Sequence, residues 1–360
     1  MLMSKEYCVK EYGSEFPLNN KYSTIQKAFS VDGFTNSIYF RSGRDAIGFI
    51  AKEYRESKRV LMPSYSCKSM VQPFINNDYQ IIYYKLTSDF QVDITDIYKK
   101  LDDNTILLYI DYFGKDIGLK SYIGEMRDLY SNIIIIEDRT HDLFSEKQYS
   151  DLPDYIVSSL RKWLALPDGG ILFSNHNIHV SELSNDCYFF KMRMHGMKIK
   201  HQYLLNGNIL LKDEYRRMLS NAENYLDRQT EILGITNTSK TLFECCFDNI
   251  KENRNENYRY LYDIFYKSNK LDYLLFNYIP KCPIYFPIIT NNRNEVQKRL
   301  AENSIYCPVI WPITDEAREV CSISYNISEH ILSIPCDQRY NHGDMEYVGE
   351  IILKILEEIN

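Results

Sequence analysis

The sequence contains no uninterrupted apolar run of about 18 residues, which is the length that a membrane-spanning helix requires. Its first residues, MLMSKEYCVKEYG, also lack the long apolar stretch of a secretory signal peptide. These two absences argue against a membrane protein and against a secreted protein. We therefore expect a soluble chain in the cytoplasm.

Cysteine pairs with the spacing of a metal or redox site are absent as well. The nine cysteines are scattered and form no C-x-x-C motif, so neither a disulfide framework nor a zinc site is indicated. Basic clusters are also lacking, since 42 lysines and arginines stand against 49 acidic residues for a net charge of −7. We expect no nucleic-acid partner, because proteins that bind the phosphate backbone carry a basic surface.

What the sequence does have is an alternation of strand-like and helix-like segments over residues 36–175. Hydrophobic residues make up 44% of the chain, enough for a substantial core. The runs at 106–110 and 133–136 are apolar on both faces, which is typical of parallel strands covered by helices on either side. The pattern predicts an α/β fold with three layers and a mostly parallel central sheet.

A different pattern begins near residue 180. It predicts one long helix within 212–233 and, further on, a smaller α+β part that ends in a helix at 344–358. We therefore divide the chain into a large domain, residues 1–235, and a small C-terminal domain, residues 236–360.

Polar residues follow several of the predicted strands, where open α/β sheets bind their ligands. The segment SGRD places Gly43 at the start of a helix, whose free N–H groups favour a phosphate. An ordinary N-capped turn explains the same residues. The strand IIIIED ends in Asp138, three residues before His141. Asp138 is either a cap or a buried anion that keeps a ring nitrogen protonated, and His141 is either a ligand contact or a core histidine.

The segment SLRKWLALPDGG, residues 159–170, places Lys162 just after another strand. A lysine there is ordinarily solvated, but in an apolar pocket its pKa falls and the amine becomes a nucleophile. The order along the chain is a glycine turn, then Asp138, then Lys162 after 24 residues (162 − 138). A phosphate cradle, a carboxylate for a pyridinium nitrogen and a reactive lysine are the parts that pyridoxal phosphate needs.

On these features the sequence resembles the fold-type-I pyridoxal-phosphate enzymes and, among them, the DegT/DnrJ/EryC1/StrS family of sugar aminotransferases. The resemblance covers roughly residues 35–355. The segments that carry it are SGRDAI (42–47), MPSYSCKS (62–69), EDRTHD (137–142), SLRKWLALPDGG (159–170), RMHG (193–196) and SIPCDQRY (333–340).

The resemblance implies three catalytic residues. Lys162 would form the covalent link to the cofactor aldehyde and then move the proton between substrate and cofactor carbons. Asp138 would pair with the pyridine nitrogen, and His141 would lie beside the ring near its phenolic oxygen.

The resemblance also implies how pyridoxal phosphate is held. Gly43, Arg44 and Ser159 would bind the phosphate. Tyr65 or Cys67 would lie against the ring face, and the position that relatives usually fill with a stacking aromatic falls nearer Cys67.

Three departures mark the chain as a divergent relative. Val157 stands where the family often has a serine, Glu214 lies near the place of an asparagine that reaches the neighbouring subunit, and Asp111 replaces a frequent histidine.

By resemblance, the reaction would be amino transfer from glutamate or a similar donor to a keto sugar carried on a nucleotide, in a homodimer. His195 and Arg339 are the candidate substrate contacts, Arg339 because an arginine fork suits a carboxylate. Two alternatives stay open: the same cofactor acting on a non-sugar ketone or in an elimination, and a non-catalytic regulatory relative.

Overall fold

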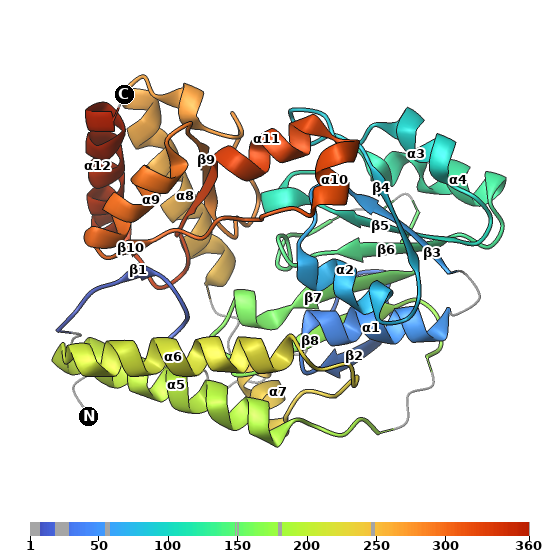
Figure 1. The fold of residues 1–360 in the computed structure, drawn as a ribbon, viewed down its shortest axis with the longest axis horizontal. Coiled ribbons are helices and arrows are strands. Elements are labelled where there is room, and N and C mark those ends of the chain that lie inside the picture. The colour runs from blue at the N-terminus through green and yellow to red at the C-terminus, as the bar shows by residue number, and fades with distance from the viewer. Residues whose placement is uncertain are drawn as a thin grey trace.

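The computed structural model describes residues 8–18, 29–54, 58–147, 149, 151–178, 182–245 and 249–359 (Figure 1). Its main sheet has seven strands: β2 (Asn36–Phe40), β3 (Arg59–Pro63), β4 (Gln80–Tyr84), β5 (Thr105–Ile110), β6 (Ile134–Asp138), β7 (Tyr155–Ser159) and β8 (Gly170–Ser174). Their order across the sheet is β2-β8-β7-β6-β5-β3-β4. Strand β8 runs antiparallel to both neighbours, and every other adjacent pair is parallel.

The sheet is the middle layer of the large part of the chain. Strand β5 is buried at every position, so both of its faces are covered, as parallel strands of continuous apolar character require. The prediction of a three-layer, mostly parallel α/β sheet is confirmed.

Four helices alternate with these strands: α1 (Gly43–Glu53), α2 (Lys68–Ile75), α3 (Ile94–Lys100) and α4 (Ile123–Leu129). Helix α1 begins where the side chain of Ser42 accepts a hydrogen bond from the backbone N–H of Asp45. This cap satisfies one of the N–H groups that a helix leaves free in its first turn. The expected helix after the SG turn is therefore present.

The chain then forms two long antiparallel helices, α5 (Cys187–Asn206) and α6 (Ile209–Leu226), which lie along the lower edge in Figure 1. Gly207 ends α5 with a φ of 71°, and the Asn208 side chain caps α6. The helix predicted within 212–233 is α6, which ends earlier because the following residues return to the sheet, where Gly234 bridges Phe40.

The C-terminal part packs around a second hydrophobic cluster, which includes Leu261, Val296, Leu332 and Ile352. The elements after α6 are α7 (Asn237–Glu244), α8 (Ile250–Lys267), β9 (Phe286–Ile289), α9 (Arg293–Glu302), β10 (Ile305–Tyr306), α10 (Asp315–Val320), α11 (Ser322–His330), β11 (Ile331–Ile334) and α12 (His342–Ile359). Of these, α7, α10 and α11 contribute their buried apolar residues to the main core instead. Strands β9 and β11 pair antiparallel, while β10 pairs in parallel with β1 (Tyr12–Gly13) near the N-terminus. The predicted final helix is α12, and the domain boundary at residue 235 stays a prediction.

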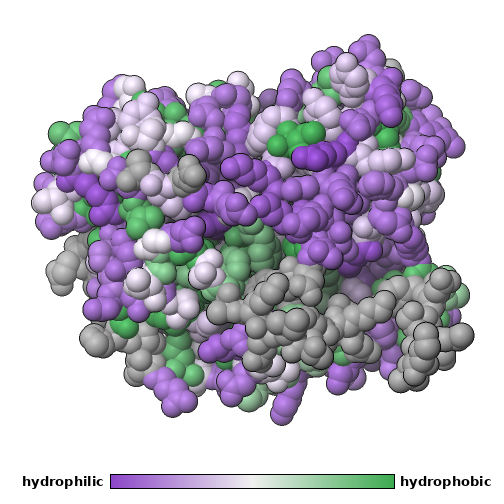
Figure 2. Space-filling view, turned by 180° about the vertical axis from the view of Figure 1, so that it is seen from behind, coloured by the Kyte–Doolittle hydropathy of each residue, from purple (hydrophilic) through white to green (hydrophobic). Residues whose placement is uncertain are grey.

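The surface is largely polar. Figure 2 shows the face behind that of Figure 1 with mainly hydrophilic residues, and hydrophobic colour shows chiefly in a central band. Within the described ranges, every helix is too short or too polar to span a bilayer.

Candidate active site

The polar strand ends lie together at one edge of the main sheet. The register pairs Ile110 of β5 with Asp138 of β6, and Asp138 in turn with Val157 of β7. Strand β7 continues into the 3₁₀ turn η3 (Leu160–Lys162), which carries the candidate lysine. Parallel pairing therefore carries these polar groups to the same edge, as the sequence predicts.

Cys67 lies within electrostatic range of both Asp138 and Lys162. It precedes α2, on the connection from β3, and its thiol is half-buried. Burial raises the pKa of Cys67, the carboxyl of Asp138 raises it further, and the ammonium of Lys162 lowers it. A carboxylate from β6 and an amine from η3 thus act on one thiol that comes from β3.

Asp138 is a buried carboxyl, with 5% of the residue exposed. The backbone N–H of Thr140 donates to its Oδ1 at 2.7 Å. Burial raises the pKa of Asp138 to about 6, against the hydrogen bonds from Thr140 that lower it. No ion pair between described residues reaches this carboxyl. At neutral pH it is mostly charged, and a cation placed against it would lower its pKa and be held strongly.

His141 is buried and neutral. Burial, followed by the charge of Lys162, lowers the pKa of the imidazole to about 3. The backbone N–H of Phe113 donates to Nδ1 across 3.5 Å, which assigns the remaining ring proton to Nε2. The indole of Trp311 stacks on the ring with centroids 4.8 Å apart. His141 can therefore offer a hydrogen bond from Nε2 to a ligand.

Lys162 has an exposed side chain on an anchored turn. The indole Nε1 of the next residue, Trp163, donates to the carbonyl of Thr140 at 2.9 Å, and Gln338 donates to the Trp163 carbonyl at 2.7 Å. The next two residues, Trp163 and Leu164, pack into the hydrophobic core, whereas the Lys162 side chain is exposed, so these two residues do not form an apolar pocket around the amine.

The start of α1 and the end of β7 form the phosphate-binding candidate. A Cβ at Gly43 would lie 3.4 Å from the Cβ of Ser159, so the free N–H groups of the helix begin beside the serine. Arg44 is directed elsewhere, with a guanidinium nitrogen 2.7 Å from Oδ1 of Asp227, whose side chain is largely exposed.

The double glycine has a packing role in the same region. A Cβ at Gly170 would come within 2.6 Å of the backbone N of Gly43, and Gly169 has a φ of 151°. The N–H of Gly169 donates to the Arg41 carbonyl at 2.7 Å. Only glycine lets β8 pass so close to the start of α1.

The two candidates for the ring face are placed differently. Tyr65 is fully buried, its hydroxyl donates to the carbonyl of Ile310, and its ring packs against Trp311 and Tyr112. Cys67 is the one on which Asp138 and Lys162 act. Because Tyr65 is fully buried and Cys67 is partly exposed, Cys67 is the better placed of the two to contact a ligand.

His195 and Arg339 are the two residues that the sequence predicted to contact the substrate. His195 is exposed on α5, and because helical residues two apart point about 200° from each other, it projects away from the buried Arg193. Arg339 makes two hydrogen bonds of 2.7 Å to Asp337 and lies over the ring of Phe16. The guanidinium of Arg339 is thus already paired within the chain.

An ionic chain beside Lys162 was not anticipated from the sequence. Glu223 of α6 pairs with Arg161 and with Arg193, and Arg193 also pairs with Glu15. Burial raises the pKa of Glu15, but Arg193 outweighs it and the pKa falls to about 2. Lys162 also acts on Glu15 and Glu223. Arg161 and Arg193 lie in segments that carry the family resemblance, but Glu15 and Glu223 are distant in sequence and belong to none of those segments.

Trp311 was also missed. It is one of two tryptophans in the chain, and that rarity is the one signal that singles it out. It comes from the connection between β10 and α10, far along the chain from His141.

Solved structures provide the comparison, since no protein-family model and no curated protein matches the sequence. Helicobacter pylori PseC, an aminotransferase involved in pseudoaminic acid biosynthesis, superimposes with a TM-score of 0.66 at 14% identity, covering 97% of this chain and 100% of PseC. A putative sugar aminotransferase from Streptococcus pneumoniae, Spr1654 in its PLP form, gives 0.64 at 12% identity over 91% of this chain and 88% of its own. The chain has the sugar-aminotransferase fold.

Other solved structures with this fold are similar to the same extent. Bacillus subtilis NtdA with bound PMP gives a TM-score of 0.63 at 14% identity, over 90% of this chain and 74% of its own. The sugar-aminotransferase fold is thus shared across nearly the whole chain while the sequence has diverged widely.

Proposed function

We propose that this chain is a divergent member of the DegT/DnrJ/EryC1/StrS group and a pyridoxal-phosphate-dependent aminotransferase. It transfers an amino group from glutamate or a similar donor to a keto sugar carried on a nucleotide. The observation that carries the proposal is the convergence of Asp138 and Lys162 on Cys67, inside a sugar-aminotransferase fold.

The residues present fit pyridoxal phosphate. Asp138 is a buried carboxyl whose pKa of about 6 leaves it charged at neutral pH, and no described residue forms an ion pair with it. A protonated ring nitrogen is the cation that such a carboxylate would hold. The start of α1 beside Ser159 offers free N–H groups and a hydroxyl for the phosphate.

Bound pyridoxal phosphate supplies an electron sink that makes proton removal from a carbon next to an imine feasible. The chain supplies the rest. Lys162 presents an exposed amine that can take and return that proton, and Asp138 would hold a protonated ring nitrogen. Neutral His141 offers its Nε2 proton to an oxygen, while Trp311 covers its ring and limits the access of water.

The substrate contacts, the assembly and the compartment belong to the same proposal. Arg339 would bind the donor carboxylate after leaving Asp337, and His195 would contact the sugar. We expect a homodimer, the commonest symmetric assembly, in the cytoplasm. The pathway would be polysaccharide or glycan synthesis, in keeping with the pseudoaminic acid pathway of PseC.

Borohydride reduction after incubation with pyridoxal phosphate tests the proposal directly. Mass mapping should find the cofactor on Lys162, and Lys162→Ala should lose the visible absorbance of the bound cofactor. Lys52→Ala, at an exposed position of α1, is the matched control and should keep both. Absorbance that is unchanged in Lys162→Ala would refute the assignment.

Amino transfer separates the proposed reaction from its alternatives. Isotopically labelled glutamate should pass its nitrogen to the cofactor and then to a keto-sugar nucleotide. Cofactor binding without nitrogen transfer would favour elimination, although the lysine at position 162 argues against the dehydratase relatives, which tend to carry histidine there. Absence of cofactor binding would favour a regulatory relative.

A further inference from the structure

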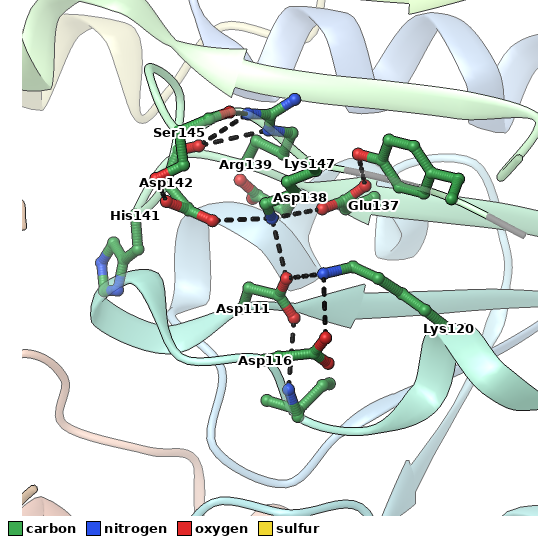
Figure 3. A network of polar contacts seen from close by, with 12 residues as sticks. Asp111, Asp116, Lys120, Glu137, Asp138, Arg139, His141, Asp142, Ser145 and Lys147 are labelled. Atoms are coloured by element: carbon green, nitrogen blue, oxygen red, sulfur yellow. Dashed lines mark hydrogen bonds and ion pairs between the residues drawn. The ribbon is translucent and has the colours of Figure 1, made fainter. Parts of the chain in front are cut away.

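A buried lysine lies at the centre of an ionic network behind the proposed site (Figure 3). The Nζ of Lys147 lies 2.7 Å from Asp111, 2.6 Å from Glu137 and 2.8 Å from Asp142, and only 6% of the lysine side chain is exposed. The three carboxylates are themselves almost fully buried. One ammonium therefore joins three separate points of the chain.

Each of these carboxylates is next to a group of the site. Glu137 immediately precedes Asp138, and Asp142 immediately follows His141. Asp111 begins the turn whose Phe113 N–H donates to His141 Nδ1. In Figure 3 the imidazole of His141 projects away from the network, at the bend of the loop that Lys147 closes.

The carboxylates and the ammonium of this network stay ionised at neutral pH. Burial raises the pKa of Asp111 and of Glu137, but the neighbouring cations, Lys147 first, together outweigh it, and both pKa values lie below their ordinary range. Burial lowers the pKa of Lys147, yet the carboxylates, Asp111 first, raise it well above its usual value. Breaking a buried ion pair by removing one partner is strongly unfavourable, so the three segments stay attached to the ammonium.

The other two cations near the network, Lys120 and Arg139, do not bridge the same three carboxylates as Lys147. Lys120 also pairs with Asp111, but it contacts neither Glu137 nor Asp142 in the ion pairs between described residues. Arg139 donates to the backbone carbonyls of Asp142, Leu143 and Ser145, which shapes the loop itself. Lys147 is thus the cation that ties the loop to both strand ends.

We propose that Lys147 is a positioning residue of the active site, which holds Asp138, His141 and the Phe113 turn in register through Glu137, Asp142 and Asp111. The inference rests on the proposed function for its catalytic meaning, but its geometric content concerns the protein alone. A lysine that only stabilised the fold would change the unfolding free energy and leave the environment of His141 intact.

Titration of His141 in the cofactor-free protein tests the inference. With ¹³C-labelled histidine, the NMR signal that disappears in His141→Gln belongs to His141, among the seven histidines. In the wild type this signal should not titrate between pH 8 and 5, because burial and Lys162 lower the pKa of His141 to about 3. In Lys147→Met the freed loop should hydrate the ring and raise the midpoint by more than about two pH units, into the measured range above pH 5.

Two further variants make the result specific. Lys120→Met should behave as the wild type, and Lys147→Arg, which keeps the charge, should restore most of the wild-type titration. A His141 signal in Lys147→Met that stays as flat as in the wild type would overturn the inference. If Lys147→Met does not fold, the double variant Lys147→Met/Glu137→Gln replaces it, because it removes one charge of each sign. The titration of its His141 signal is then compared with that of the wild type.

A cofactor readout separates this inference from the proposed function. If pyridoxal phosphate binds, Lys147→Met should shift the pH dependence of the bound-cofactor absorbance while Lys120→Met leaves it unchanged. If the wild type takes up no cofactor, the proposed function fails, and the titration of His141 still decides whether Lys147 positions the loop.

Discussion

Trp311 lies nearly flat on His141, with the two rings inclined by 26° and their centroids 4.8 Å apart. The indole comes from the C-terminal half of the chain and the imidazole from the end of β6, so the contact joins the sheet edge to the segment after β10. The buried, neutral state of His141 depends on this cover.

Replacement of Trp311 should therefore change the protonation of His141. In Trp311→Ala the exposed imidazole should regain an ordinary pKa near about 6.5, against about 3 in the wild type. Titration of the His141 NMR signal measures the change. Trp311→Phe keeps an aromatic cover and should leave most of the wild-type behaviour, and an unchanged titration in Trp311→Ala would show that other groups bury the ring.

The buried carboxylate of Asp138 should lower the free energy of unfolding of the cofactor-free protein. Its pKa of about 6 lies above that of an unfolded aspartate, so the folded state binds the proton more tightly and loses stability as the pH rises from about 4 to 6. Two pKa units correspond to roughly 3 kcal/mol at most. Urea unfolding should find Asp138→Asn more stable than the wild type at pH 8, by an amount that shrinks at pH 4.5.

The same substitution should weaken cofactor binding, because an amide cannot balance a protonated ring nitrogen. Asp93→Asn, at the N-cap of α3, is the control for a general effect of removing a carboxylate. Equal stability gaps at both pH values would show that Asp138 does not titrate in this range.

Gly170→Ala should destabilise the fold by about 3 kcal/mol, since its Cβ would meet backbone at the start of α1 that cannot move aside. Gly343→Ala is the matched control: it lies in α12, an added Cβ there would lie 3.5 Å from the nearest atom, Oδ1 of Asn341, and alanine favours the helix. Chemical denaturation of both variants measures the difference. A Gly170→Ala variant as stable as the wild type would mean that β8 and α1 can separate without cost.

Glu223→Gln should lower stability by about 2 kcal/mol, because it leaves Arg161 and the buried Arg193 short of a counter-charge. The value is reduced from that of a fully buried pair, since about a third of the Glu223 side chain is exposed. Asp227→Asn breaks the more exposed pair with Arg44 and should cost less than about 1 kcal/mol. Equal losses in the two variants would contradict this difference in burial.

Local sequence patterns were sufficient for much of the fold and part of the site. The apolar runs of β5 and β6 predicted buried parallel strands. Asp138 at the end of β6 and Lys162 just after β7 lie at one edge because these strands are parallel and end on the same side. The alternation of elements likewise predicted three layers. These features depend on neighbours in sequence and on the fixed geometry of strands, and both can be recognised in a single amino-acid sequence.

The surroundings of those residues could not be predicted in the same way. No periodicity links Trp311 to His141, or Lys147 to Asp111 and Glu137. The apolar residues after Lys162 proved to be core residues rather than the walls of a pocket around the amine.

The sequence by itself determined which strands form and which chemical groups stand at their ends, because short-range hydrophobic periodicity and chain direction are local properties. Only the tertiary structure decided that Asp138 is buried without an ion-pair partner among the described residues, that Trp311 covers His141 and that Lys147 joins three carboxylates. Burial and charge pairing arise between segments far apart in the chain, and their energies depend on distances that exist only after packing is complete.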